Sequence, residues 1–310
     1  MGEQSSVTFK ASDYYAPKFW PMWCIFGLLR VVSLLPYRVE MALGRLFGRF
    51  VFLAAGTRRR RIVDINLASC FPEKPLAERN RIKSACYQNL GISLIEMAMC
   101  WWWSPEKLRP LVEIKGRENL DAVLESGRGA ILLAGHFSTL EIGARLLALY
   151  VPLQVMYRTQ RNPMFDSYLF TKRGGYFVNT VSRKNTRQLI KGIKKGITTW
   201  YAPDQDFRRE RNVFAPFMGI AAASITASSR LAQSSGAAMM PYYPERKKDG
   251  SGYILHIEPP LPDFPSGDDL IDATQINQSI EKYARLFPEN YVWIHQRFKT
   301  RPPGEAPFYQ

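Results

Sequence analysis

The chain has 310 residues, and its 42 Lys and Arg residues against 27 Asp and Glu residues give a formal net charge of +15. A chain of this length buries a full core, and 46% hydrophobic with 22% charged residues excludes wholesale disorder. The positive charge leaves three partner classes open, namely nucleic acid, an anionic membrane surface, and an acidic substrate or carrier.

The first distinctive segment is apolar and lies near the amino terminus. Residues 19–35 read FWPMWCIFGLLRVVSLL, a stretch of 17 residues. As a helix it would be about 26 Å long, near the lower limit for crossing a bilayer. Trp20 and Trp23 lie at its leading edge, where interfacial aromatic residues are found. We predict a hydrophobic membrane-anchoring helix, spanning or monotopic; the alternative is a buried helix of the core.

A second apolar segment follows, and it carries arginines. Arg38, Arg45 and Arg49 are interleaved with leucines and phenylalanines, as in a helix that lies in the membrane interface. The run Arg58 to Arg61 comes next, and basic residues after an anchor favour the cytoplasmic side for the rest of the chain. A solvated charge run is the alternative. We therefore predict an anchor with interfacial helices over residues 1–60 and an α/β domain over residues 61–310.

The remainder alternates between helical and strand patterns. Residues 62–103 have apolar positions at helical spacing, broken near the start by Pro72 and Pro75. Short apolar runs predict strands at residues 130–134, 151–157, 196–202, 237–243 and 253–258. Helices are expected after the strand at 130–134 through Ala148, over residues 184–195, and after Asp272. This alternation predicts an α/β fold, a mixed, largely parallel sheet flanked by helices.

One motif at a strand end carries chemistry. GHFSTLE at residues 135–141 follows the strand at 130–134, and sites in parallel α/β sheets form at the carboxyl ends of strands. His136 is a candidate general base, and Glu141, five residues later, is a candidate partner for one ring nitrogen. No serine or cysteine in the motif is clearly placed as a nucleophile, which favours direct transfer to a substrate hydroxyl. The alternatives are a buried structural His136 and a capping box formed by Ser138 and Glu141.

The motif and its surroundings resemble a known family. His-x4-Glu after a strand is similar to the His-x4-Asp/Glu motif of glycerolipid-type acyltransferases. Three segments resemble those of a narrower group, namely AGHFSTLE, Tyr157-Arg158 with Arg161-Asn162-Pro163, and PDQDFRRERNVFAPFMG at 203–219. That group is the late acyltransferases of lipid A biosynthesis, which act on a Kdo-bearing lipid A precursor. NLASCFPE at 66–73 and the YVWIHQRFKTRP tail extend the resemblance along nearly the whole chain.

The resemblance implies a mechanism and a set of site residues. His136 would be the general base on a hydroxyl of a 3-hydroxyacyl chain, and Glu141 its orienting partner, with no covalent acyl-enzyme. The donor would be an acyl-acyl carrier protein. Arg173 would stabilise the thioester oxyanion or hold a phosphate, and the remaining binding candidates are Arg158, Arg161, Asp204, Asp206, Arg208 and Arg209. The basic loop after Asp206 departs from the glycine-containing version expected for the family.

The positive charge is concentrated close to these motifs. Between Tyr157 and Arg211 there are thirteen basic residues and four acids, which is +9 of the total +15. We expect this region to attract a phosphorylated, anionic glycolipid acceptor and the acidic carrier protein. Nucleic acid is not expected, because no groove-reading or RNA-binding signature accompanies the charge.

Cysteines and histidines give no sign of a metal or a disulfide framework. The four cysteines have no metal-like spacing and favour a reducing compartment. His256 and His295 are expected to be structural, and neither a metal nor a cofactor is expected. The predicted location is the inner membrane of a Gram-negative bacterium, with the catalytic domain facing the cytoplasm.

Two alternatives stay open at this point. The first is an acyltransferase with the same chemistry on another acceptor, such as a lysophospholipid or a mannosylated inositol lipid. The second is a non-enzymatic basic protein that binds membrane or nucleic acid. Neither the acyl chain length nor the order of acylation follows from the sequence, because length selection depends on the depth of a pocket.

Overall fold

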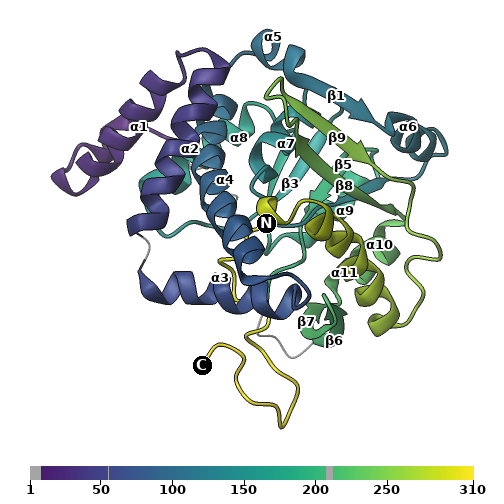
Figure 1. The fold of residues 1–310 in the computed structure, drawn as a ribbon. Helices are drawn as coiled ribbons and strands as arrows, with labels where there is room; N and C mark the ends of the chain where they lie inside the picture. Colours follow the sequence, from purple (N-terminus) through teal and green to yellow (C-terminus); the bar gives the residue numbers. More distant parts are fainter. Residues whose placement is uncertain (1–7, 55, 207–211) are drawn as a thin grey trace.

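The computed structural model describes residues 8–54, 56–206 and 212–310, which form a central sheet with helices on both faces (Figure 1). The strands are β1 (Val112–Lys115), β2 (Ala130–Leu133), β3 (Leu153–Tyr157), β4 (Asn179–Ser182), β5 (Thr198–Tyr201), β6 (Asn212–Phe217), β7 (Ile220–Ile225), β8 (Ala238–Arg246) and β9 (Tyr253–Ile257). The helices are α1 (Trp20–Val32), α2 (Tyr37–Ala54), α3 (Thr57–Cys70), α4 (Leu76–Trp102), α5 (Pro105–Leu108), α6 (Arg117–Glu125), α7 (Leu140–Leu147), α8 (Pro163–Gly174), α9 (Thr186–Ile193), α10 (Ala227–Ser235) and α11 (Asp269–Leu286).

The main sheet confirms the predicted α/β class. Its seven strands have the order β1-β9-β8-β2-β5-β3-β4, and neighbouring strands are parallel except for β8 and β9. The five predicted strands correspond to β2, β3, β5, β8 and β9. Sequence patterns missed β1 and β4, which have four residues each, and the separate antiparallel hairpin of β6 and β7.

The sheet separates two apolar cores. Side chains of β2 alternate between its faces, so that Ala130 and Leu132 join one core, while Ile131 and Leu133 join the other. The first core contains residues of α1, α4 and α7, and the second contains residues of α3, α9, α10 and α11. The continuous burial of β2 reflects these two covered faces, which is typical of a central parallel strand.

Close packing of α2 on α4 joins the N-terminal helices to the rest of the molecule (Figure 1). A Cβ atom at Gly48 would lie 2.3 Å from the carbonyl oxygen of Tyr87. A Cβ atom at Gly91 would lie 2.2 Å from the carbonyl oxygen of Gly44. Glycine at these positions therefore permits a backbone approach that any side chain would block.

The predicted spanning anchor is not found. Over residues 8–54, 56–206 and 212–310, none of the helices combines the length and apolar character needed to cross a membrane. The apolar stretch at 19–35 forms α1, which has 13 residues. One side of α1 is buried, because Phe26 packs its ring against Trp101 and Tyr168. The division at residue 60 stays a prediction, and α3 runs across it.

Candidate active site

His136 lies three residues after the end of β2, at the edge of the sheet where the sequence predicted chemistry. Its ring nitrogen Nδ1 is 2.5 Å from Oδ1 of Asp204, and its backbone N–H donates to Oδ2 of the same carboxylate at 2.8 Å. Asp204 follows β5, which pairs directly with β2. Adjacent parallel strands thus bring together two residues that are 68 positions apart in the chain.

Asp204 is held as a buried carboxylate. Its side chain is 1% exposed, and the Tyr291 hydroxyl donates a further hydrogen bond to Oδ2 at 3.0 Å. Burial alone would raise the pKa of Asp204, but the His136 ring and its backbone N–H, together with Arg297, lower that pKa well below its ordinary value. An ionised Asp204 accepts the Nδ1 proton, so the lone pair of Nε2 is available to take a proton from a substrate.

Glu141 has partners other than His136. The Arg173 guanidinium donates from Nε to Oε1 at 3.0 Å and from Nη2 to Oε2, and the Tyr176 hydroxyl donates to Oε1 at 3.0 Å. The prediction that Glu141 orients the His136 ring is therefore wrong for Nδ1, whose partner is Asp204. Glu141 lies at the start of α7 and faces Arg173 on α8.

The ion pair between Glu141 and Arg173 is largely withdrawn from solvent, with side chains 17% and 15% exposed. Burial would raise the pKa of Glu141, but the charge and hydrogen bonds of Arg173 and the hydroxyl of Tyr176 lower it. Both groups are therefore charged at neutral pH. The Nε and Nη2 atoms of Arg173 are used by Glu141, and the side chain also lines a cavity next to His136.

The capping-box interpretation of Ser138 and Glu141 is not supported. The residue before α7 is Thr139, and no side chain caps this helix end. The Ser138 hydroxyl instead accepts a hydrogen bond from Nη1 of Arg246 at 3.0 Å. Arg246 in turn donates to Glu96 at 2.6 and 2.8 Å, which anchors the turn after His136 to α4.

The C-terminal segment after α11 completes the surroundings of His136. The backbone N–H of Val292 donates to the carbonyl oxygen of His136 at 3.0 Å, and Phe137 forms an isolated β-bridge with Tyr291. Tyr291 and His295 were missed as site residues, although both lie in the YVWIHQRFKTRP stretch that carried part of the resemblance. His256, also expected to be structural, pairs with Glu245 at 2.8 Å.

His295 lies next to the catalytic candidate. Its ring centroid is 5.4 Å from that of His136, and its Nδ1 is 3.4 Å from Nε2 of Gln205. Burial, with a smaller contribution from the neighbouring His136, lowers the pKa of His295 to about 4, and Asp204 opposes this shift. His295 is therefore neutral at physiological pH.

A cavity of about 670 Å³ opens beside His136. Its apolar lining includes Leu140, Met156, Tyr157, Phe165 and Trp200. Its cationic lining comprises Arg158, Arg161, Arg173 and Arg183. The structure thus brings three of the predicted binding residues, namely Arg158, Arg161 and Arg173, to one cavity that also has room for an apolar chain.

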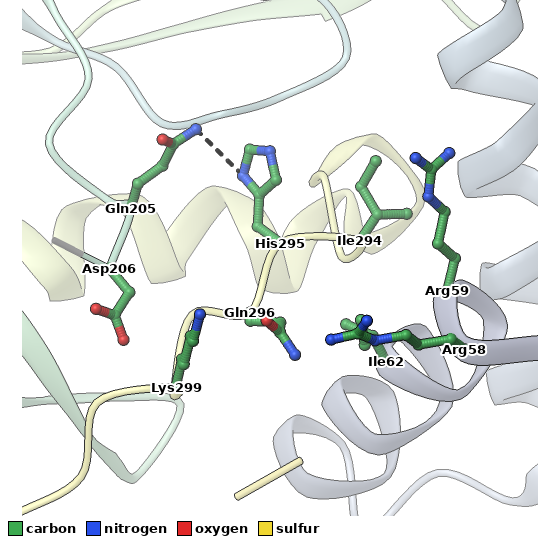
Figure 2. Close-up of a pocket in the computed structure, with 9 residues that line it drawn as sticks. All are labelled: Arg58, Arg59, Ile62, Gln205, Asp206, Ile294, His295, Gln296 and Lys299. Atoms are coloured by element: carbon green, nitrogen blue, oxygen red, sulfur yellow. Dashed lines mark hydrogen bonds between the residues drawn. The ribbon is translucent and has the colours of Figure 1, made fainter. Parts of the chain in front are cut away.

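A second cavity of about 430 Å³ shares Gln205 with the first and is shown in Figure 2. Asp206 lies in its wall, where it accepts hydrogen bonds from the backbone N–H and the hydroxyl of Thr300 at 2.6 and 2.9 Å. Asp206 thereby fixes the C-terminal segment near the site. The predicted residues Arg208 and Arg209 lie outside the residues that the structure describes.

The described parts of the chain contain no group of three or more His, Cys, Asp or Glu residues that could hold a metal ion. The four cysteines are free thiols; Cys24 is exposed, and Cys70, Cys86 and Cys100 are buried. Burial raises the pKa of the Cys100 thiol well above its ordinary value, so this thiol is not a ready nucleophile.

Comparison with known proteins gives one consistent family. The model of the family described as "Bacterial lipid A biosynthesis acyltransferase" matches residues 8–300. A lipid A biosynthesis lauroyltransferase of Escherichia coli K12 is 37% identical over 293 residues, which are 93% of this chain and 94% of that protein. A palmitoleoyltransferase of the same strain is 35% identical, covering 96% and 97% of the two chains. A myristoyltransferase of that strain is 28% identical, covering 95% and 91%.

Proposed function

This chain belongs to the bacterial lipid A biosynthesis acyltransferases, and from that premise we propose that it transfers a fatty acyl chain from acyl-acyl carrier protein to a hydroxyl of a 3-hydroxyacyl chain on a Kdo-bearing lipid A precursor. The observation that carries the mechanism is the contact between Nδ1 of His136 and the buried carboxylate of Asp204. It leaves Nε2 of His136 available as a base, and His136 lines a cavity that also has apolar side chains.

The reaction we propose is a direct transfer. Nε2 of His136 takes the proton of the acceptor hydroxyl, and the oxygen attacks the carbonyl carbon of the donor thioester. The tetrahedral intermediate collapses as the C–S bond breaks, the thiolate receives the proton from His136, and an ester and a free thiol result. Asp204 stabilises the imidazolium that forms and keeps the ring in the tautomer with the proton on Nδ1.

Two observations support transfer without a covalent enzyme intermediate. Among the described side chains, none with a hydroxyl or thiol forms a hydrogen bond to the His136 ring, whose partner is Asp204. The Ser138 hydroxyl, the nearest candidate in the chain, is buried and engaged by Arg246. A serine or cysteine nucleophile would need contact with the base that activates it.

Glu141 and Arg173 have a separate task in this proposal. Glu141, which also accepts a hydrogen bond from the Tyr176 hydroxyl, fixes the Arg173 guanidinium at the wall of the larger cavity. A fixed positive charge there stabilises negative charge on the substrate, either on the developing oxyanion or on a phosphate. Glu141 thus acts on the reaction through Arg173 rather than through His136.

The outer faces of α1 and α2 support binding of the protein at the membrane surface without a membrane-spanning helix. Exposed apolar side chains line them, namely Trp20, Ile25, Leu28, Val31, Val39, Leu43, Leu46, Phe47, Phe50 and Leu53. On α2 this stripe is flanked on one side by the exposed arginines Arg38, Arg45 and Arg49. An apolar stripe beside cations is typical of helices that lie in an anionic interface, so we propose the cytoplasmic leaflet of the inner membrane as its partner.

Mass spectrometry of lipid A from cells that lack the gene tests the function. We expect lipid A one acyl chain short of the parental molecule, restored by the wild-type gene but not by a His136→Ala gene. An unchanged acylation pattern in the deletion strain would refute the assignment of lipid A as the acceptor.

A further inference from the structure

The smaller cavity, beside His295, has a composition that the transfer chemistry does not explain. It is lined by Arg58, Arg59 and Ile62 of α3, by Gln205 and Asp206 after β5, and by Ile294, His295, Gln296 and Lys299 of the C-terminal segment. In Figure 2, Arg58 and Lys299 point toward Gln296 from opposite sides of the space. The run of arginines at residues 58–61 therefore contributes two members to a cavity near His136.

The positive charge of this cavity is not neutralised by ion pairs among the described residues. Arg58, Arg59 and Lys299 form no ion pair with a carboxylate in the described ranges. Asp206 is the one acid among the lining residues that the structure describes, and Thr300 engages both of its oxygens. His295 is neutral at physiological pH because burial and the neighbouring His136 lower its pKa to about 4. The lining thus carries a net positive charge.

The local backbone adds to this charge instead of offsetting it. Arg58 and Arg59 lie in the first turn of α3, and that turn contains no acidic residue. The amino-terminal end of a helix is the positive end of its dipole, where cations are unfavourable and anions are stabilised. Two arginines and a lysine around one space are therefore best balanced by a bound anion.

We propose that this cavity binds an anionic group, a phosphate or a sugar carboxylate, on the headgroup of the glycolipid acceptor; this rests on the proposed function. Among the described residues of its lining there is no Phe, Tyr or Trp, and Ile62 and Ile294 are the only aliphatic ones, so the cavity suits a polar headgroup. The larger cavity has the apolar lining that an acyl chain needs. The two cavities share Gln205, and the rings of His295 and His136 are 5.4 Å apart. A headgroup held beside His295 would therefore leave an attached hydroxyacyl chain within reach of His136.

The test compares two double variants with the same change in charge. Arg58→Gln/Arg59→Gln removes the two cavity arginines. Arg60→Gln/Arg61→Gln removes their neighbours, which contact the Phe52 ring and the carbonyl oxygen of Gln310 and do not line the cavity. The measurement is equilibrium binding of a phosphorylated, Kdo-bearing lipid A precursor in neutral detergent micelles, without donor. We expect the cavity variant to bind about tenfold more weakly than the wild type, and the control variant to bind within about twofold.

Two further arms separate the possible sources of the anion. Steady-state kinetics should show a raised KM for the acceptor and an unchanged KM for the acyl-carrier donor. The deficit of the cavity variant should shrink for an acceptor that lacks its phosphates or its Kdo sugars, because the lost partner is then absent from both complexes. Thermal unfolding of each variant checks that the fold is intact, and Lys299→Gln supplies an independent single change in the same lining.

Equal acceptor binding by the wild type and the cavity variant would overturn the proposal. A raised KM for the donor alone would overturn it as well, because the anion would then belong to the carrier's prosthetic group. Wild-type protein that binds the acceptor in a manner that depends on Arg58 and Arg59 but transfers no acyl chain would refute the proposed function and leave the cavity assignment standing.

Discussion

Replacing Asp204 by Asn tests the link between this carboxylate and the base most sharply. Asp204 accepts from the backbone N–H of His136 at 2.8 Å, from Nδ1 at 2.5 Å and from the Tyr291 hydroxyl at 3.0 Å. An amide offers one oxygen in place of two. Either its NH₂ group faces the backbone N–H of His136, or it faces Nδ1 and forces the ring proton onto Nε2.

Each arrangement has a measurable consequence. If the amide nitrogen faces Nδ1, Nε2 cannot accept a proton, and kcat falls by the general-base contribution of about 10²- to 10⁴-fold. If it faces the backbone, a buried N–H loses its acceptor, at a cost of about 1–3 kcal/mol in the free energy of unfolding. We expect the first effect to dominate, with the KM for the acceptor changed less than about threefold.

Asp272→Asn is the matched control. Asp272 is also a buried carboxylate that accepts from a backbone N–H and a hydroxyl, both of Ser266, at 2.8 and 2.7 Å. Both bonds go to Oδ1, which an amide oxygen can replace, so this variant should lose less stability than Asp204→Asn and keep its kcat. The assay is initial-rate acyl transfer with urea unfolding of the same samples. An Asp204→Asn protein with a kcat within about twofold of the wild type would refute the proposed pairing.

Three other outcomes follow from the geometry. Glu141→Gln and Arg173→Gln should each lower kcat/KM by about tenfold. The double variant should lose little more, because the two residues act as one unit. Additive losses in transfer assays would contradict this. The double variant Leu46→Glu/Phe50→Glu should reduce co-sedimentation with vesicles containing anionic lipid by about tenfold and leave thermal unfolding unchanged. Unaltered sedimentation would argue against binding of these helices at the membrane surface. The pKa of His295 is about 4 in the folded protein and about 6.5 in the unfolded chain, so its contribution to stability is complete above pH 6.5 and is lost as the pH falls toward 4. Urea unfolding should show this loss, about 3 kcal/mol, for the wild type but not for His295→Phe. Parallel pH profiles of the two proteins would contradict it.

The sequence predicted the strand before His136 and the edge of the sheet where chemistry lies, because apolar runs and a strand-end motif are local signals. It named Asp204 as a site residue but not as the partner of His136. That pairing depends on β5 lying next to β2, and the order of strands in a sheet is not written in the order of the chain. Glu141 was assigned to His136 by proximity in sequence, whereas α7 directs it toward α8.

The apolar stretch at 19–35 shows another limit of local patterns. Its composition suits either lipid or a protein core, and in the structure it has one buried side and one exposed side. Phe26 and Leu29 are buried within the molecule, whereas Trp20, Leu28 and Val31 are exposed. A hydropathy window averages these faces and cannot tell which side chains have a protein partner.

The arginine run at residues 58–61 was interpreted from the sequence as a signal for the cytoplasmic side or as a solvated charge run. Which of its members line a cavity is decided by the rotation of α3 against the C-terminal segment, a contact between residues far apart in the chain. His295 entered the site by the same route, since the segment after α11 packs back along the edge of the sheet next to His136.

The most direct test of the account is acyl transfer by purified His136→Ala protein, beside the wild type, from carrier-bound acyl chains of graded length to a Kdo-bearing lipid A precursor. We expect the wild type to add one acyl chain to the precursor, seen as the corresponding mass increase, and the variant to be slower by about 10²- to 10⁴-fold. A variant that transfers acyl chains at the wild-type rate would contradict the assignment of His136 as the base.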